Sequence, residues 1–255
     1  MVKGGRGDNP GKDRFPAGPV REVAMPLRSA GSGTIGTVPR DAVHHPLFAR
    51  YYARFSVSAE SRLGLAGMRD RLLAGLSGRV IEIGAGNGLN FAHYPSAVSE
   101  VVAIEPERTL RHLAVESALR SEVPVDVVPG AAEKLPVKSE AFDAVVLSLV
   151  LCSVRDVPRT LAEVRRVLRP GGVVRFFEHG RGGGPAMAFT QRALDRTLWP
   201  PLNGGCHLAR DPVAALRAAG FELGPYRRVL IPEKGPTLPT SYCVLGTAWR
   251  PATEE

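Results

Sequence analysis

The segment from Val80 to Asn90 constrains this chain more than any other part of its sequence. It begins with Val-Ile-Glu-Ile, a short apolar run typical of a buried strand in a parallel sheet. Gly84, Gly86 and Gly88 follow at every second position, and glycine lets the backbone turn sharply where a side chain would block a ligand. A strand followed by such a turn predicts a binding site for a nucleotide-like cofactor.

The spacing of the glycines separates two classes of ligand. A dinucleotide site uses G-x-G-x-x-G, which points a helix N-terminus at the pyrophosphate and here requires glycine at position 89. Position 89 is leucine. The pattern present is E-x-G-x-G-x-G, and its acidic residue, Glu82, would repel a phosphate but attract an ammonium or a sulfonium. The turn therefore favours a cationic cofactor.

Apolar runs that alternate with helical patterns predict the fold. We expect strands at 80–83, 101–104, 125–128, 142–151, 173–177, 227–231 and 242–248. We expect a first helix that begins at residue 46 and further helices at 60–76, 108–119, 154–168, 185–199 and 211–219. Between the first two strands, Pro95 leaves room for only a short or irregular crossover. Seven strands with crossovers predict an α/β fold, a Rossmann-like doubly wound sheet with helices on both faces.

The domain organisation follows from where the buried pattern begins. Residues 1–44 are rich in Gly, Pro and Arg and lack apolar positions that could offset the entropy of ordering. We interpret them as a flexible, solvated tail, with contact to an anionic partner as the alternative. A single catalytic domain is expected at 45–250.

The charge, the cysteine content and the length of the apolar runs limit which partners and which compartment we expect. The formal net charge is +8, but arginine is scattered and no block of like charges occurs, so no nucleic-acid partner is expected. The chain has three cysteines, Cys152, Cys206 and Cys243, and none of them forms a CxxC motif. An odd number without that spacing favours free thiols in a cytoplasmic protein. No apolar run reaches the roughly eighteen residues that cross a bilayer and no signal-peptide core is present, so no membrane span is expected.

At these motifs the chain resembles class I S-adenosylmethionine-dependent methyltransferases of the methyltransferase type 11 kind. The resemblance implies this cofactor and an acidic residue after the second strand that bonds both ribose hydroxyls. Glu105 matches it, 105 − 84 = 21 residues after Gly84. Residues 130–136 resemble the family's G-D-A-E-x-L-P turn, which holds the adenine edge, although Ala131 replaces the aspartate. The implied cofactor contacts are Glu82, Gly84, Ala85, Gly86, Gly88, Glu105, Pro106, Ala131, Ala132, Glu133 and Leu149.

A closer resemblance, over roughly residues 73–221, is to the methyltransferase-like 7 group, whose members are thiol S-methyltransferases. It rests on Val-Leu-Cys-Ser-Val at 150–154, Phe-Glu-His at 177–179 and Gly-Cys-His-Leu-Ala-Arg-Asp at 205–211. That group is tethered to membranes by an apolar N-terminus, whereas a polar Gly/Pro tail stands here. The resemblance therefore implies a soluble, bacterial-type relative.

Candidate residues for the chemistry lie near the expected ends of strands. His179 ends the fifth strand and is the candidate general base, with a structural histidine as the alternative. Tyr51, Cys152, Cys206 and His207 are candidates for the acceptor pocket, and simple packing is the alternative for the tyrosine and the cysteines. We expect no metal, because the wide spacing of Cys206, His207 and Cys152 makes a metal site there a minor alternative.

The expected function is transfer of a methyl group from S-adenosylmethionine to a small-molecule nucleophile, with a thiol favoured. A thiol near neutral pH is already partly ionised, so a dedicated base is optional. One alternative is O-, N- or C-methylation of a quinone, phospholipid or natural product. Another is a cofactor-binding sensor or scaffold without turnover. The oligomeric state stays open.

Overall fold

A computed structural model of the chain describes residues 46–252. The chain divides into two units, residues 1–37 and 38–255, and every described residue belongs to the second. The predicted tail at 1–44 lies outside the described residues, so its structure stays a prediction.

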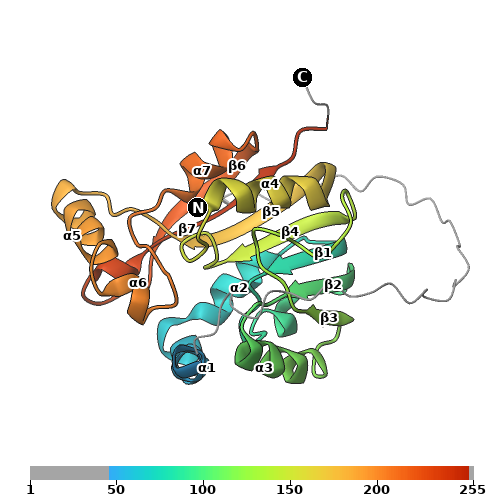
Figure 1. The fold of residues 1–255 in the computed structure, drawn as a ribbon, viewed down its shortest axis with the longest axis horizontal. Coiled ribbons are helices and arrows are strands. Elements are labelled where there is room, and N and C mark those ends of the chain that lie inside the picture. The colour runs from blue at the N-terminus through green and yellow to red at the C-terminus, as the bar shows by residue number, and fades with distance from the viewer. Residues whose placement is uncertain (1–45, 253–255) are drawn as a thin grey trace, which may run out of the picture. The chain divides into compact units, whose positions relative to one another are not determined.

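Seven strands form one sheet in the order β3-β2-β1-β4-β5-β7-β6 (Figure 1). β1 to β5 pair in parallel, whereas β7 runs antiparallel to both β5 and β6. The predicted seven-stranded, doubly wound sheet is therefore confirmed. The strands are β1 (Gly78–Ile83), β2 (Val98–Ile104), β3 (Val125–Val128), β4 (Phe142–Ser148), β5 (Leu168–His179), β6 (Glu222–Leu230) and β7 (Tyr242–Trp249).

Helices cover both faces of the sheet because side chains alternate along each buried strand. In β1, Ile81 belongs to the same core cluster as Leu161 of α4, whereas Val80 belongs to the cluster that contains Leu72 of α2. None of the described helices combines the length and apolar content needed to cross a membrane. The helices are α1 (Pro46–Leu63), α2 (Leu65–Leu73), α3 (Arg108–Ala118), α4 (Val157–Val167), α5 (Pro185–Asp195), α6 (Trp199–Leu202) and α7 (Pro212–Ala218), with 3-10 turns at Phe91–His93 and Pro239–Ser241.

Several predicted element boundaries are wrong, among them the starts of β5 and β6, which lie at Leu168 and Glu222 rather than at 173 and 227. The helix expected at 60–76 is divided by Gly64, whose φ of 67° ends α1 and separates it from α2. The strand expected at 142–151 ends at Ser148, because Leu149 has a φ of 58° and turns the chain out of the sheet. The helix expected at 185–199 ends at Asp195, and α6 is a separate short helix.

The strand order places a ligand site between β1 and β4. β1 lies between β2 and β4, so the chain changes its direction of travel across the sheet at this point. In open α/β sheets, ligands bind in the crevice at the carboxyl ends of the strands on either side of such a switch. Here that crevice lies between the glycine turn after β1 and the loop that begins at Leu149.

Candidate active site

The glycine turn after β1 is built from three residues in the left-handed region. Gly84, Gly86 and Gly88 have φ values of 69°, 59° and 77°, which cost a residue with a side chain about 1–2 kcal/mol each. A Cβ at Gly84 would also lie 2.8 Å from Cγ2 of Val150, in the loop after β4. The predicted sharp turn is confirmed, and the close approach of the neighbouring loop is a second reason for glycine at position 84.

A cavity lies between this turn and the loop after β4, and Tyr52 of α1 forms part of its wall. Tyr51, the predicted pocket residue, lies outside the described lining, because it is 61% exposed and stacks on Phe55 with 5.8 Å between ring centroids. Successive helix residues project about 100° apart, so only one of the two tyrosines can face the site. The described lining residues are Tyr52, Leu65, Met68, Arg69, Leu72, Glu82, Gly84, Ala85, Asn87, Leu89, Asn90, Ser148, Leu149 and Phe177.

Glu82 lies in the cavity wall with both carboxylate oxygens hydrogen bonded. Asn90 Nδ2 donates to Oε1 at 2.7 Å, and the Tyr94 hydroxyl donates to Oε2 at 2.7 Å. Arg69 Nη1 in turn donates to Asn90 Oδ1 at 2.6 Å. Burial raises the pKa of the Glu82 carboxyl. Because each carboxylate oxygen carries two lone pairs, Glu82 keeps capacity to accept from a ligand in the cavity.

Glu105 follows β2 and connects two loops through its carboxylate. The backbone N–H of Gly86 donates to Oε2 at 2.8 Å, and that of Glu107 donates to Oε1 at 2.8 Å. Burial raises the pKa of Glu105 to about 7, against the lowering effect of these two backbone hydrogen bonds. The Arg111 side chain donates to the carbonyl oxygens of Glu105 and Pro106 and so fixes this corner. The predicted position of Glu105 at the end of β2 is confirmed.

The predicted adenine turn after β3 forms a tight, partly exposed corner. Lys134 N–H donates to the Ala131 carbonyl at 3.0 Å, and Ala132 is buried within the turn. The Glu133 carboxylate accepts from the Arg155 backbone N–H at 3.0 Å, which connects this turn to the loop after β4. None of these residues belongs to the described cavity lining, so their contact with adenine stays a prediction.

Sequence reasoning missed Glu178, a fully buried carboxylate next to His179 in β5. Its Oε1 accepts from the N–H groups of Val150 and Leu151 at 2.8 and 2.9 Å, and its Oε2 accepts from Cys152 N–H at 3.3 Å. Burial raises the pKa of this carboxyl. Glu178 therefore holds the loop after β4 in place. The available signal was an acidic residue directly after the apolar pair Phe176 and Phe177.

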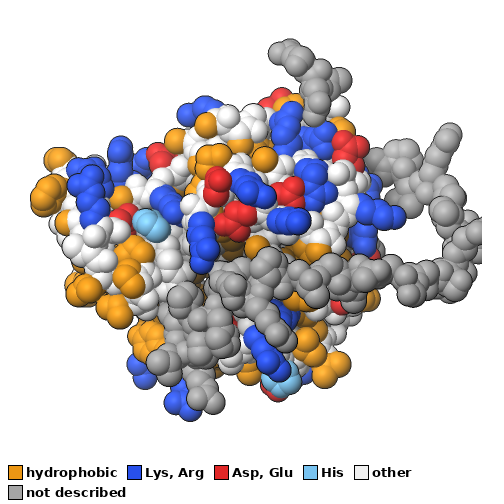
Figure 2. All heavy atoms as spheres, viewed as in Figure 1, with side chains coloured by type: hydrophobic (Ala, Val, Ile, Leu, Met, Phe, Trp, Pro, Cys, Tyr) orange, Lys and Arg blue, Asp and Glu red, His pale blue; other side chains and the backbone are white. Residues whose placement is uncertain are grey.

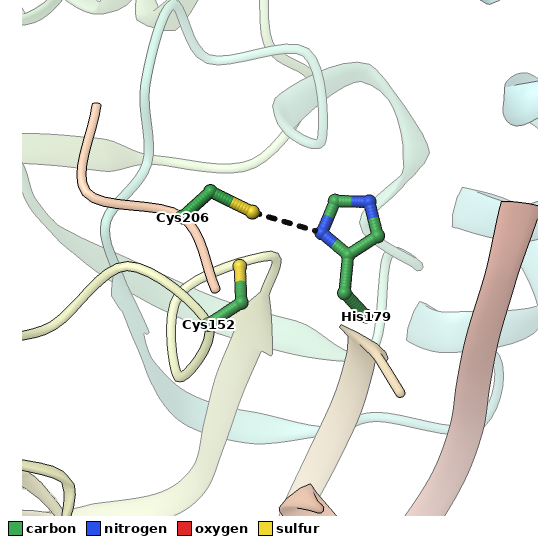
Figure 3. Close-up of side chains that lie close together, drawn as sticks. All are labelled: Cys152, His179 and Cys206. Atoms are coloured by element: carbon green, nitrogen blue, oxygen red, sulfur yellow. Dashed lines mark hydrogen bonds between the residues drawn. The ribbon is translucent and has the colours of Figure 1, made fainter. Parts of the chain in front are cut away.

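Two cysteines and a histidine converge at the ends of β4 and β5. One ligand atom from each of Cys152, His179 and Cys206 lies within 4.8 Å of the others, and Cys206 Sγ is 3.4 Å from His179 Nδ1 (Figure 3). A hydrogen bond with Cys206 and burial raise the pKa of the Cys152 thiol well above its usual value. His207 does not join them, because its Nδ1 contacts the Gly205 carbonyl oxygen at 2.7 Å. The base role of His179 stays a prediction.

The segment that carries Cys206 is fixed by charged side chains. The Asp195 carboxylate accepts from the N–H groups of Leu208 and Ala209 at 2.7 and 2.9 Å. Arg210 Nη1 donates to the carbonyl oxygens of Leu151 and Val154 at 2.6 and 2.8 Å. The segment after α6 is thereby held against the loop after β4.

Comparison with known proteins decides the family. The methyltransferase domain family matches residues 81–176, from β1 to β5. The ubiquinone/menaquinone biosynthesis C-methyltransferase UbiE of Syntrophotalea carbinolica is 30% identical over 196 residues, which cover 70% of this chain and 81% of UbiE. This chain belongs to the S-adenosylmethionine-dependent methyltransferases. The cofactor predicted from the glycine turn and Glu105 is therefore confirmed as S-adenosylmethionine.

This methyltransferase is also similar to the human thiol S-methyltransferase TMT1B. The two are 36% identical over 155 residues, which cover 58% of this chain and 63% of TMT1B, so the chain spans less than two thirds of that relative. A solved S-adenosylmethionine-dependent methyltransferase from Thermotoga maritima superimposes with a TM-score of 0.58 at 21% identity, over 80% of this chain and 98% of that one. The predicted class I methyltransferase fold is confirmed.

Proposed function

We propose that this methyltransferase transfers the methyl group of S-adenosylmethionine to the sulfur of a small thiol. The observation that carries the choice of acceptor is the similarity to the human thiol S-methyltransferases TMT1B and TMT1A, each 36% identical over 155 and 154 residues. The chemistry of the described cavity wall supports the same choice.

The cofactor would lie across the carboxyl ends of β1 and β2. Its amino-acid end would occupy the cavity, where Glu82 offers negative charge to the ammonium group. The ribose hydroxyls would donate to the second lone pairs of the Glu105 carboxylate, whose first lone pairs already hold Gly86 and Glu107. The sulfonium methyl would then face the loop that begins at Leu149.

Methyl transfer from a sulfonium is an in-line displacement. The thiol first loses its proton to solvent, and a lone pair on the resulting thiolate sulfur forms the new S–C bond while the bond from the methyl carbon to the sulfonium breaks. Its electron pair stays on that sulfur, which gives neutral S-adenosylhomocysteine. Alignment of donor and acceptor can supply much of the acceleration.

The cavity wall is suited to an acceptor that ionises without a strong base. Its described residues include no histidine, lysine or cysteine, and the neighbouring His179 is already in contact with the Cys206 thiol. Both Glu82 oxygens already hold donors, and burial raises the pKa of the Tyr52 phenol. A small thiol is partly thiolate near neutral pH, whereas an amine, phenol or ring carbon gains more from a nearby base.

A quinone-type ring carbon is the second candidate acceptor. It is favoured by the UbiE relative and by a demethylmenaquinone methyltransferase from Renibacterium salmoninarum that is 35% identical over 115 residues. Methylation of a ring carbon also requires removal of a proton, and His179 at the end of β5 is the candidate base for this reaction.

A panel of acceptors at one cofactor concentration tests the proposal. The panel contains radiolabelled S-adenosylmethionine with a small alkyl thiol, an aryl thiol, the phenol of matching shape and a demethylmenaquinol analogue. We expect kcat/KM for the better thiol to exceed that of the phenol and the quinol by at least tenfold. A quinol that reacts faster than both thiols would replace the proposal with the second candidate. Tight cofactor binding without turnover of any acceptor would favour a sensor.

A further inference from the structure

We propose that Cys152, His179 and Cys206 bind one zinc ion, and that its fourth coordination position is open to the acceptor thiol. The role in activating the acceptor rests on the thiol methylation proposed above, whereas the zinc site itself does not. Sequence reasoning considered His207 as the third ligand, but the structure brings His179 to the two cysteines instead.

The distances fit a tetrahedral site. Zinc bonds of about 2.3 Å to sulfur and about 2.0 Å to nitrogen place a sulfur and a nitrogen ligand roughly 3.5 Å apart. Cys206 Sγ and His179 Nδ1 are 3.4 Å apart. One donor atom from each of the three residues lies within 4.8 Å of the other two, and Figure 3 shows the two thiols and the imidazole pointing toward a common point. Small rotamer adjustments therefore suffice to bring all three onto one ion.

The donor set selects the metal and the type of site. Two thiolates and one imidazole suit zinc and other soft or borderline ions rather than magnesium or calcium, which prefer oxygen. Structural zinc sites use four protein ligands, whereas catalytic zinc sites use three and leave a position for water or substrate. Cys243, the remaining cysteine, faces His179 in the β5–β7 register but is not part of the cluster.

The backbone around the cluster is fixed in a way that is typical of a preformed site. Glu178 accepts from Cys152 N–H, and His207 N–H donates to the Cys152 carbonyl at 2.7 Å. Gly205, with a φ of 86°, lies so close to the same loop that a Cβ there would be 2.9 Å from the Ser153 carbonyl oxygen. The two cysteine-bearing segments are thus held together by contacts that do not involve the thiols. Such support limits the entropy lost when a metal binds.

The cluster adjoins the cavity where the methyl group would lie. Leu149 lines the cavity and also packs against the buried apolar cluster formed by Cys152, Cys206 and Leu208. Tyr52 of α1 lines the same cavity. A thiol bound to the fourth zinc position from the cavity side would therefore have its sulfur next to the donor methyl.

The zinc would lower the pKa of the bound acceptor thiol, as metals do for coordinated thiols and water. The thiol proton would pass to solvent and the sulfur would stay on the zinc as a thiolate. That sulfur would then form the S–C bond to the methyl group as the methyl–sulfonium bond breaks. The neutral thioether product is a weaker ligand and would leave.

Metal binding by the full chain tests the site without any methyl transfer. The protein is purified under reducing conditions, stripped with a chelator, dialysed with zinc and analysed for metal. We expect one zinc per chain. Replacement by cobalt(II) should give thiolate-to-cobalt charge-transfer absorption and the strong visible bands of a four-coordinate ion, and a small thiol should shift those bands. No stoichiometric metal in the reduced wild-type protein would overturn the proposal.

Matched variants show whether these three residues are the ligands. Cys206→Ser and His179→Gln should each weaken zinc binding at least tenfold and lose or alter the cobalt spectrum, with melting curves to verify folding. Cys243→Ser and His207→Gln are the matched controls, because each removes a side chain of the same type that lies outside the cluster. Both variant proteins should retain one zinc. Equal weakening by Cys243→Ser and Cys206→Ser would contradict the assignment. If a variant does not fold, the wild-type stoichiometry and cobalt spectrum still decide the question.

The outcomes separate the zinc site from the proposed reaction. Zinc binding without methyl transfer to any thiol would sink the proposed function and leave the site in place. Transfer to a thiol at an unchanged rate by the zinc-free protein would leave the function in place and refute the activation role. A Cys152–Cys206 disulfide in air, together with no metal uptake by the reduced protein, would overturn the site.

Discussion

The Glu105 carboxylate accepts a hydrogen bond of 2.8 Å from the backbone N–H of Gly86. The end of β2 is thereby tied to the glycine turn that follows β1, and the residue proposed to bind ribose also fixes the turn beside the cofactor. Loss of this carboxylate should therefore affect the cofactor site more than the removal of a surface charge would.

The first prediction concerns cofactor affinity. Glu105→Ala removes the proposed acceptor of the ribose hydroxyls and should weaken S-adenosylmethionine binding by about 1.5–3 kcal/mol, the worth of a charge-assisted hydrogen bond. Isothermal titration calorimetry on the folded variant measures the change. Glu100→Ala, which removes a partly exposed partner of Arg79, is the control and should bind as wild type does. Unchanged affinity of Glu105→Ala would refute the ribose role.

The second prediction concerns stability and pH. Burial raises the pKa of Glu105 to about 7 in the folded protein, above its value of about 4.3 in an unfolded chain. Between these values the folded state binds more protons than the unfolded state, so the free energy of unfolding falls as pH rises from about 4.5 to 7. The contribution of Glu105 to the free energy of unfolding is fully present below about pH 4.5 and is lost as the pH rises to about 7. It amounts to up to roughly 3 kcal/mol. Urea unfolding of Glu105→Gln should show a shallower decline, and parallel profiles would contradict the shift.

The third prediction separates backbone strain from close packing at Gly84. Gly84→Ala combines a φ of 69° with a Cβ 2.8 Å from Val150 and should lower the free energy of unfolding by about 2–4 kcal/mol. Gly75→Ala shares the positive φ, at 73°, but its Cβ would meet no atom within 4 Å, so it should cost only about 1 kcal/mol. Gly183→Ala has neither feature and should be near neutral. Equal losses at positions 84 and 75 would show that Val150 moves aside.

The fourth prediction concerns the acid that sequence reasoning missed. Glu178→Gln replaces an acceptor of three backbone N–H groups with an amide that has one acceptor oxygen and its own donor. We expect the free energy of unfolding to fall by roughly 2–3 kcal/mol. Glu133→Gln is the matched control, because Glu133 is only partly buried and its carboxylate accepts from Arg155 N–H at a partly exposed corner. It should change stability by less than about 1 kcal/mol. Similar effects of both substitutions would count against the proposed support of the loop after β4.

Local sequence was sufficient to predict a cationic cofactor and the sheet, and the family resemblance named the cofactor. The spacing of Gly84, Gly86 and Gly88, the acid at position 82 and the acid at position 105 are properties of short segments. The apolar runs are long enough to identify all seven strands, although Leu149 ended one of them early by adopting a left-handed conformation. A positive φ at leucine has no sequence signal and is rare, and it occurs here in the wall of the cavity.

The acceptor side of the site could not be predicted because it depends on contacts between distant segments. The choice between Tyr51 and Tyr52 depends on the rotation of α1 where it packs against α2 and α3, which helical periodicity alone does not fix. The contact of Cys206 with His179 depends on how the segment after α6 packs on the loop after β4. His207 is adjacent to Cys206 in sequence yet turns to its own backbone. Wide spacing in sequence therefore argued against a metal site, although the fold brings three possible ligands together.

The most direct test of the central claim is a single-turnover reaction with methyl-deuterated S-adenosylmethionine and a small thiol. Mass spectrometry measures the product and the spent cofactor in the same sample. The account predicts an S-trideuteromethyl thioether and an equal amount of S-adenosylhomocysteine, with both lost in Glu105→Ala at limiting cofactor. A demethylmenaquinol analogue that takes up the label while no thiol does would contradict it.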